Sequence, residues 1–388
     1  MLDNYVTAST SRVKSDKNVP RGKFEELKKT AKKKLSSKAF HSKANLNGVT
    51  IEFNGNSHHQ YEFWKMNWFE GMKPSVDGRI FSAFGVEGVE PSAYYCPETN
   101  ESVFFNTEYY GQCKSWALGM AAAVLERDFN THSIHGACAQ VEGKGVIIVA
   151  PTGTGKTTQA FKLMELPGGR VVGDDWVYIN HDEGENQGYL VGRQPEKSLY
   201  MRTETQKDKP WLRNTFDESK CENIVVNKTD CEFTDGDYGC KMTGNTCVFD
   251  DGNRWCYYAF GNSRALVRRE DLLGADKIAD DARVDLLVLL RRDTTSPAAV
   301  RLDADKAVEV LKKGEFMVRP GAGPKDMWGK LGSEPWYNPY LLRLDNARQE
   351  QFFRDMISKF GVKCLLLNTG VESIESTHKR ILKALASS

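Results

Sequence analysis

The stretch Gly145-Val-Ile-Ile-Val-Ala150-Pro-Thr-Gly153-Thr-Gly155-Lys156-Thr157-Thr158 joins an apolar run to a glycine-rich turn that ends in Lys-Thr-Thr. The apolar run 145–150 predicts a buried strand, and residues 156–164 predict a helix. A strand followed by a glycine-rich turn and a helix is the setting in which backbone N–H groups converge on a phosphate. The stretch therefore predicts a phosphate-binding loop in an α/β fold.

The residue types in this loop indicate a nucleoside triphosphate and a divalent cation. The nucleotide-binding residues that we expect are Gly153, Thr154, Gly155, Lys156, Thr157 and Thr158. Lys156 is expected to reach the β- and γ-phosphates of ATP, and the Thr157 hydroxyl is expected to hold Mg²⁺. Ala150 stands where the strict pattern has glycine, but the later glycines make most of the anion cradle.

An aspartate pair follows the next predicted strand. Val171 and Val172 lead through Gly173 into Asp174 and Asp175. Ligands of α/β sheets bind beyond the carboxyl ends of strands, so these carboxylates are expected beside the phosphates. One of them can hold the cation while the other acts as a base toward an attacking hydroxyl, and the sequence does not distinguish the two.

Composition divides the chain into three predicted regions: a lysine-rich N-terminal arm (1–44), a small β-rich N-terminal α+β domain (45–108), and a P-loop kinase domain (109–388) with a β-hairpin insertion at 185–260. Strands are expected at 49–53, 61–68, 103–106, 138–142, 284–290 and 362–367. Helices are expected at 112–127, 303–313, 345–359 and near 376–385. The predicted fold class is α/β, with a mixed sheet in the kinase domain.

The N-terminal arm is strongly basic. Residues 1–44 carry twelve Lys or Arg against four acids, and five of the lysines lie between 28 and 34. A solvated arm or helix is expected, and two interpretations stay open: an exposed lysine-rich helix of no special function, or a patch that contacts a polyanion such as nucleic acid.

The bulk composition argues against a membrane protein or a disulfide scaffold. The net charge is +1 over 388 residues, and no apolar run approaches the roughly 20 residues of a membrane helix. The nine cysteines are interpreted as reduced thiols, which predicts a cytoplasmic protein. Five of them lie between Cys221 and Cys256 without a Cys-x-x-Cys pair, so scattered thiols and a zinc site both stay open.

Several landmarks in one order resemble ATP-dependent phosphoenolpyruvate carboxykinase, and the shared series of His-Gly, phosphate loop and Asp-Asp also resembles HPr kinase/phosphorylase. The landmarks are Asn106-Thr-Glu-Tyr109-Tyr-Gly111-Gln-Cys-Lys114, Ile134-His135-Gly, Gly153-Thr-Gly155-Lys156-Thr157, Val172-Gly-Asp174-Asp175, Val248-Phe-Asp-Asp-Gly252, Gly261-Asn-Ser-Arg264 and Leu366-Leu-Asn-Thr-Gly370-Val371. The resemblance covers about residues 105–388. It implies a carboxykinase-like nucleotide fold in which His135 and one of the two aspartates approach a catalytic Mg²⁺ or Mn²⁺. It also implies that Arg264 stabilises the transferring phosphoryl group.

One departure from the carboxykinases bears on the reaction. Ser115 follows Lys114 where that family has a second lysine that ligates manganese. We therefore expect an ATP-dependent kinase that transfers the γ-phosphoryl group to a hydroxyl, with Lys156, Asp174, Asp175, Arg264 and His135 as catalytic residues and Thr157, Asp174 and His135 as metal ligands. The acceptor could be a protein serine, a small polyol or a hydroxymethylated base in DNA. The alternatives are a shortened carboxykinase and a nucleotide-gated binding module without turnover.

Overall fold

The computed structural model describes residues 13–36, 39–151, 153–181, 188–207, 212, 215–231, 234–235, 239–241, 244, 246–256, 263–318, 327 and 329–387. The chain forms two compact units. The first comprises Met1–Ala121 with Glu196–Leu272, and the second comprises Ala122–Pro195 with Leu273–Ser388. The predicted domains differ from these units chiefly in residues 196–260, which we had assigned to an insertion in the kinase domain.

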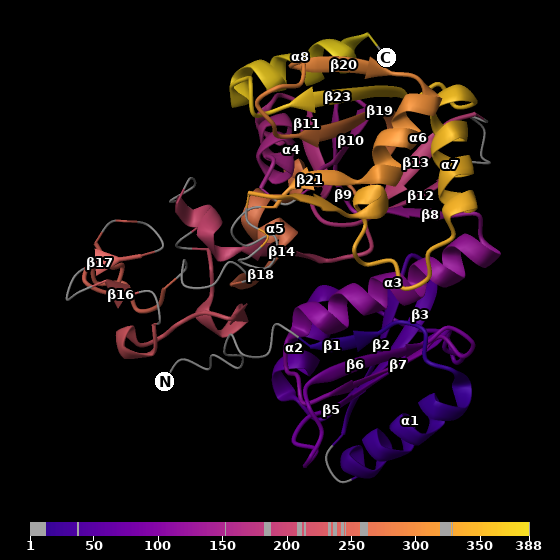
Figure 1. The fold of residues 1–388 in the computed structure, drawn as a ribbon, viewed down its shortest axis with the longest axis vertical. Coiled ribbons are helices and arrows are strands. Elements are labelled where there is room, and N and C mark those ends of the chain that lie inside the picture. The colour runs from indigo at the N-terminus through magenta and orange to yellow at the C-terminus, as the bar shows by residue number, and fades with distance from the viewer. Residues whose placement is uncertain are drawn as a thin grey trace. The chain divides into compact units, whose positions relative to one another are not determined.

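A seven-stranded sheet in the order β1-β6-β7-β5-β3-β2-β4 forms the first unit's framework. Its strands are β1 (Lys14–Asp16), β2 (Phe40–Leu46), β3 (Val49–Gly55), β4 (Phe69–Glu70), β5 (Gly78–Ala83), β6 (Ser92–Cys96) and β7 (Glu101–Phe105). Its helices are α1 (Arg21–Leu35), α2 (His58–Asn67) and the start of α3 (Tyr110–Asp128), drawn in indigo to magenta in Figure 1. The unit also holds a three-stranded sheet, β14-β18-β15 (Ser198–Arg202, Arg264–Arg268, Cys221–Glu222), the pair β16 and β17 (Thr234–Asp235, Gly239–Cys240) and most of α5 (Arg269–Leu273).

The lysine-rich segment forms helix α1, which packs on this framework. Phe24, Ala31 and Leu35 on α1 are buried against Phe81 and Val103 of the sheet. Their spacing of seven and four residues puts them on one helix face, while the lysines occupy the rest. Residues 21–35 thus form the lysine-rich helix that was one of the expected forms, with one face packed on the sheet, and residues 1–12 lie outside the described part.

The strand expected at 61–68 is wrong, because these residues belong to helix α2. Ser57 caps the helix, and its side chain accepts a hydrogen bond from the Gln60 N–H. The buried residues His59, Gln60, Phe63, Trp64 and Asn67 follow helical rather than alternating spacing. Closely spaced aromatic residues in 61–68 favour a strand, whereas the Ser57 cap and the spacing of the buried residues favour the helix.

A mixed sheet with helices on both faces forms the second unit (Figure 1). Its main order is β11-β9-β10-β19-β13-β12-β8, and β23 pairs with both β19 and β20. The strands are β8 (His132–Ile134), β9 (Gly136–Val141), β10 (Lys144–Val149), β11 (Gly169–Gly173), β12 (Val177–His181), β13 (Leu190–Arg193), β19 (Asp281–Arg291), β20 (Ala299–Leu302) and β23 (Lys363–Asn368). The helices are α4 (Lys156–Glu165), α6 (Ala304–Lys313), α7 (Asn346–Ser358) and α8 (Ile374–Ala386). A short pair, β21 and β22 (Glu315–Met317, Leu331–Ser333), completes the unit.

Successive side chains of β10 point to opposite faces of the sheet, and each face is covered by helices. Val146 and Ile148 pack with α4 and α8 in one core, while Ile147 and Val149 pack with α6 and α7 in the other. A strand buried on both faces has to be apolar throughout, and this explains the continuous run in the sequence. The predicted α/β class, the strands at 138–142, 284–290 and 362–367, and all five predicted helices are confirmed.

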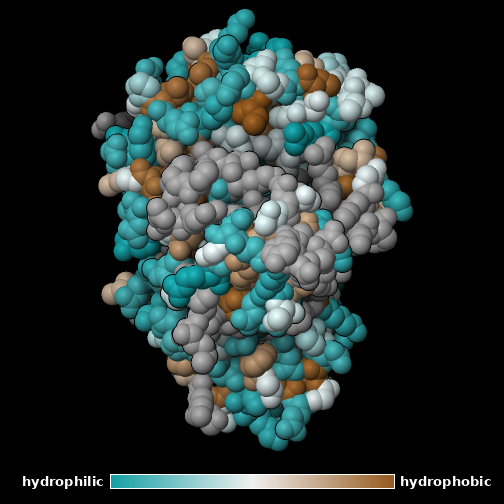
Figure 2. All heavy atoms as spheres, turned by 90° about the vertical axis from the view of Figure 1, so that its left-hand side faces the viewer, coloured by the Kyte–Doolittle hydropathy of each residue, from teal (hydrophilic) through white to brown (hydrophobic). Residues whose placement is uncertain are grey.

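On the face drawn in Figure 2, teal side chains predominate and brown ones form small scattered patches. No described helix contains an apolar stretch long enough to cross a membrane.

Candidate functional site

The strand directions bring the predicted site residues to one edge of the second unit's sheet. Strands β10, β19 and β23 are parallel, β9 is antiparallel to β10, and β11 is antiparallel to β9. Strands β10 and β11 therefore end at the edge where β9 begins. The glycine-rich turn leaves β10 there, Asp174 and Asp175 leave β11, and His135 directly precedes β9.

The turn after β10 has the backbone of an anion cradle. Gly153 has a φ of 80° and Gly155, the N-cap of α4, has a φ of 105°. A Cβ at either position would meet no atom within 4 Å, so the conformation rather than crowding requires glycine. Within the described part of the chain no side chain caps α4, and its N-terminus is therefore suited to an anion.

Neighbouring side chains fix the orientation of this turn. The Thr369 hydroxyl donates to the Thr154 carbonyl at 3.0 Å, and Arg292 Nη1 donates to the Gly153 carbonyl at 3.2 Å. In a trans peptide the carbonyl and the following N–H point in opposite directions. The Gly155 N–H therefore points away from Thr369.

Thr157 and Asp174 form one half of the site. Thr157 lies in the first turn of α4, and its hydroxyl donates to Asp174 Oδ2 at 2.9 Å. The two side chains thus present oxygen atoms at one point, and oxygen is the ligand that Mg²⁺ prefers.

Lys156, His135 and Asp175 form the other half. Lys156 Nζ lies 3.2 Å from His135 Nε2 and 3.8 Å from Asp175 Oδ1. His135 Nε2 lies 3.3 Å from the same carboxylate oxygen. The three side chains are only 12–26% exposed, so a cation, an imidazole and a carboxylate meet in a partly desolvated place.

The other nitrogen of His135 faces a backbone carbonyl. Nδ1 lies 2.8 Å from the Tyr337 oxygen, which can only accept, so Nδ1 carries a proton. The neutral imidazole then has its lone pair on Nε2, toward Lys156. The Tyr340 ring stands edge-on to the imidazole at 5.0 Å between centroids.

The backbone that supplies this carbonyl is strained. Trp336 has a φ of 62° and Tyr337 a φ of 49°, a left-handed conformation that costs bulky residues about 1–3 kcal/mol each. Buried anchors hold it: Trp336 Nε1 donates to Asn346 Oδ1 at 3.0 Å and its ring stacks on Phe353 at 5.8 Å. The Tyr337 hydroxyl donates to the Glu315 carbonyl at 3.0 Å, and burial raises the pKa of this phenol to about 12, so it remains a donor.

Arg264 belongs to the first unit. It begins β18, pairs across the sheet with Arg202, and its guanidinium lies 5.5 Å from the Tyr200 ring centroid. Gly261 and Asn262 of the same landmark lie outside the described residues. The role of Arg264 in phosphoryl transfer stays a prediction from the resemblance.

Ser115 and Lys114 also lie in the first unit, on α3. Ser115 Oγ donates to the Gln112 carbonyl at 3.1 Å, and the buried Lys114 pairs with Glu196 at 3.2 Å. The partners of both side chains, Gln112 and Glu196, belong to the first unit as well.

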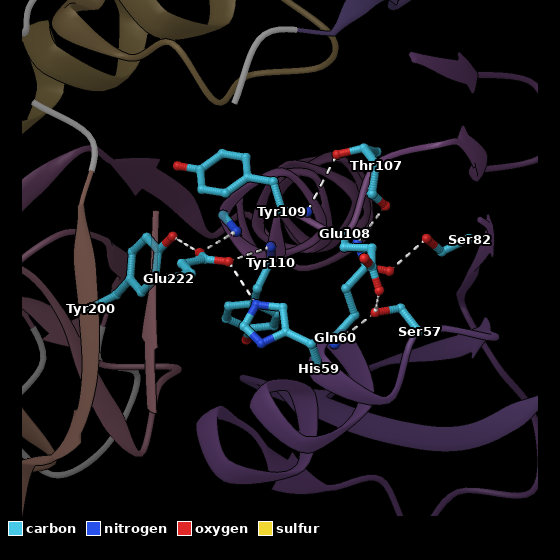
Figure 3. Close-up of polar contacts among 11 residues, drawn as sticks. Ser57, His59, Gln60, Ser82, Thr107, Glu108, Tyr109, Tyr110, Tyr200 and Glu222 are labelled. Carbon is cyan, nitrogen blue, oxygen red and sulfur yellow. Dashed lines mark hydrogen bonds and ion pairs between the residues drawn. The ribbon is translucent and has the colours of Figure 1, made fainter. Parts of the chain in front are cut away.

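A buried carboxylate that the sequence did not suggest organises the landmark at 106–114 (Figure 3). Glu222 accepts from the N–H groups of Tyr110 and Gly111 at 2.9 and 3.2 Å, and it caps α3 in this way. It also contacts His59 Nε2 at 2.8 Å and accepts a hydrogen bond from the Tyr200 hydroxyl. His59 and Glu222 are 163 positions apart, and no spacing in the sequence could have joined them.

Among the described residues, no cluster of three or more His, Cys, Asp or Glu side chains forms a self-contained metal site. A cation held by Thr157 and Asp174 would therefore take its remaining ligands from phosphate oxygens and water, as Mg²⁺ commonly does. All nine cysteines are free thiols.

The second unit thus presents a glycine-rich turn, with left-handed Gly153 and Gly155, beside an acidic pair at the edge of an α/β sheet. Over 66 residues the chain is 41% identical to the HPr kinase/phosphorylases of Geobacillus sp. (strain WCH70), Bacillus licheniformis and Bacillus pumilus. The match spans 17% of this chain and 20% of each relative, so it covers about a fifth of their length. No family model matches the chain. The resemblance to HPr kinase/phosphorylase is supported over this stretch, and the one to phosphoenolpyruvate carboxykinase stays a prediction.

Proposed function

We propose that this chain is an ATP-dependent kinase that transfers the γ-phosphoryl group of ATP to a hydroxyl of an acceptor. The observation that carries the proposal is the meeting of Lys156, His135 and Asp175 beside the Thr157–Asp174 pair, at the mouth of a glycine cradle. A bare nucleotide-binding module would need the cradle and the lysine, but not a second carboxylate paired with an imidazole.

In this proposal the loop binds the triphosphate. The N-terminus of α4 and the left-handed glycines would hold the phosphates, and Lys156 would neutralise charge on the γ-phosphate as it transfers. Such donors are preorganised by the fold, so little reorganisation is needed during the reaction.

The two aspartates would divide their roles by their neighbours. Asp174 would hold the cation, because it already contacts the Thr157 hydroxyl. When bound, Mg²⁺ supplies positive charge to the β- and γ-phosphate oxygens. His135 would be a further protein ligand of the cation, as the carboxykinase resemblance implies. Magnesium is the cation that we propose, and manganese stays a prediction of the carboxykinase resemblance.

Asp175 would act as the base. Its Oδ1 lies 3.8 Å from Lys156 Nζ, and the ammonium charge stabilises a carboxylate there. As the acceptor oxygen bonds to the γ-phosphorus and the bond to ADP breaks, the hydroxyl proton would pass to Asp175. The lone pair of His135 Nε2 lies 3.3 Å away and could receive this proton next.

A protein hydroxyl is the acceptor that we favour, because the partly similar relatives are named for kinase action on HPr. A small polyol and a hydroxymethylated base in DNA would be distinguished by experiment. The DNA option would use the exposed lysines Lys29, Lys33 and Lys34 of α1 to contact phosphates.

Fractionated lysate tests the proposal directly. Purified protein would be incubated with γ-³²P-ATP, Mg²⁺ and separate protein, nucleic-acid and metabolite fractions, with Lys156→Ala in parallel. If one fraction becomes labelled with the wild-type protein and not with Lys156→Ala, the result supports the kinase proposal and identifies the class of acceptor. Saturable ATP binding with no label in any fraction would support a binding module instead.

A further inference from the structure

We infer that the strained turn at Trp336 and Tyr337 is a positioning element that holds His135 in one tautomer, with the proton on Nδ1 and the lone pair on Nε2. The catalytic consequence rests on the proposed function, whereas the tautomer itself does not. The turn would therefore set which nitrogen of His135 faces Lys156 and Asp175.

The first argument is geometric. A carbonyl oxygen 2.8 Å from Nδ1 accepts a hydrogen bond and cannot donate one, so this contact is made only when Nδ1 is protonated. The second nitrogen of a histidine commonly has its state set through the hydrogen bond of the first. Nε2 is then an acceptor 3.2 Å from the Lys156 ammonium.

The second argument is the backbone itself. Trp336 and Tyr337 are consecutive aromatic residues with φ of 62° and 49°, where glycine or asparagine would be easier. Among the described positive-φ residues that are not glycine, the other six are five asparagines and Glu142. Strain of this kind persists where the surrounding structure imposes it, and it often marks a functional position.

The third argument is how firmly the turn is anchored. Trp336 is 2% exposed and held by Asn346 and by the Phe353 ring, which lies parallel to it within 1°. The Glu334 N–H donates to the Gly314 carbonyl at 2.9 Å, and a Cβ on Gly314 would lie 1.7 Å from the Glu334 oxygen. The missing Cβ at Gly314 thus lets the backbone before the turn approach the end of α6.

The tautomer of His135 can be measured directly in the wild-type protein. Full-length protein labelled with ¹⁵N-histidine would be studied by two-bond ¹H–¹⁵N NMR above the pH at which histidines are charged, with His135→Gln to assign the signal. We expect the pattern of an Nδ1-protonated ring. A ring protonated on Nε2, or an even mixture, would overturn the inference even if the kinase proposal holds.

Three variants test the role of the turn. Trp336→Gly permits the left-handed backbone but removes both anchors, Asn346→Ala removes only the hydrogen bond, and Trp336→Phe keeps the ring stacking. We expect Trp336→Gly to mix the tautomers and to lower kcat by about tenfold or more, as misplacement of a reacting group does. Asn346→Ala should have the same effect to a lesser degree, and Trp336→Phe should keep most of the wild-type signal and rate.

Glu142→Gly is the matched control. It relieves a positive φ of 52° in the turn between β9 and β10, at the end of β9 opposite His135. It should leave the His135 signal and kcat unchanged. If Trp336→Gly does not fold, the His135 signal and kcat of Asn346→Ala decide the question. Folded variants that keep the wild-type tautomer but have a lowered kcat would show that the turn has only a structural role, which would contradict the inference.

Discussion

Glu126 is a buried carboxylate whose titration should be visible in the stability of the second unit. It lies near the end of α3, is 8% exposed, and its Oε1 accepts from Gln349 Nε2 at 3.3 Å and Ser133 Oγ at 3.4 Å. Burial raises the pKa of this carboxyl from 4.5 to about 7. An amide would keep the two accepted hydrogen bonds without carrying a charge, so Glu126→Gln is the informative change.

The direction in which stability changes with pH depends on whether the folded or the unfolded state binds the proton of Glu126. Between about pH 4.5 and 7 the folded state holds a proton on Glu126 that the unfolded state has lost, so wild-type stability falls as pH rises through this window. The difference between the two pKa values corresponds to about 3 kcal/mol. At pH 8 we expect Glu126→Gln to be more stable than the wild type by up to about 3 kcal/mol, and at pH 4.5 the two should differ little.

Denaturant unfolding of both proteins at several pH values measures this difference. Because the chain has two units, hydrogen exchange of amides in β9 and β10 should accompany it and report on the second unit alone. His132 Nδ1 lies 3.8 Å from Glu126 Oε1, and burial lowers the pKa of this imidazole to about 3, so protein stability also falls as the pH drops below about 6.5. At pH 8 the imidazole is neutral in both proteins, and the comparison there reports on Glu126. A difference between the proteins that is the same at pH 4.5 and pH 8 would refute the reasoning.

Three further changes address the site. Asp174→Asn should lower the rate of phosphoryl transfer at least a hundredfold and alter the Mg²⁺ optimum. Asp175→Asn should lower this rate to a similar extent and leave the Mg²⁺ optimum unchanged. Mild effects of both variants that do not depend on Mg²⁺ would mean that the pair has a structural role. Gly155→Ala should destabilise the loop by about 1–2 kcal/mol through its φ of 105°, since a Cβ there meets no atom, and should weaken ATP binding; unchanged affinity by titration calorimetry would count against the cradle. With oxaloacetate, ATP and Mn²⁺, a coupled assay should detect no phosphoenolpyruvate; a turnover of about one per second would favour the carboxykinase alternative.

The parts of the fold that the sequence predicted are those with a strong local pattern. The run 145–150, the glycine turn and the Lys-Thr-Thr start of α4 all indicate the same elements, and the aspartates follow the next strand directly. The common edge then follows from strand direction, which places Lys156, Thr157, Asp174 and Asp175 together. His135 could be expected only from the resemblance, because a lone histidine before a strand has no chemical signal of its own.

The remainder could not be predicted because its causes are not local. Helix α1 is buried through Phe24, Ala31 and Leu35, whose pattern is hidden among lysines. The left-handed Trp336 and Tyr337 contradict residue preference and depend on packing against Phe353. Which aspartate faces Thr157 is decided by side-chain geometry at the end of β11, and both carboxylates look alike in the sequence.

Transfer of the γ-phosphoryl group is the most direct test of the central claim. Wild-type protein and Lys156→Ala would be compared with γ-³²P-ATP, Mg²⁺ and the acceptor fraction, after circular dichroism shows that both are folded. We predict covalent label with the wild type and less than about a tenth of that rate with Lys156→Ala, a loss of at least about 1.4 kcal/mol of transition-state stabilisation. Equal labelling by the two proteins, or no labelling of any fraction by the wild type, would contradict the account.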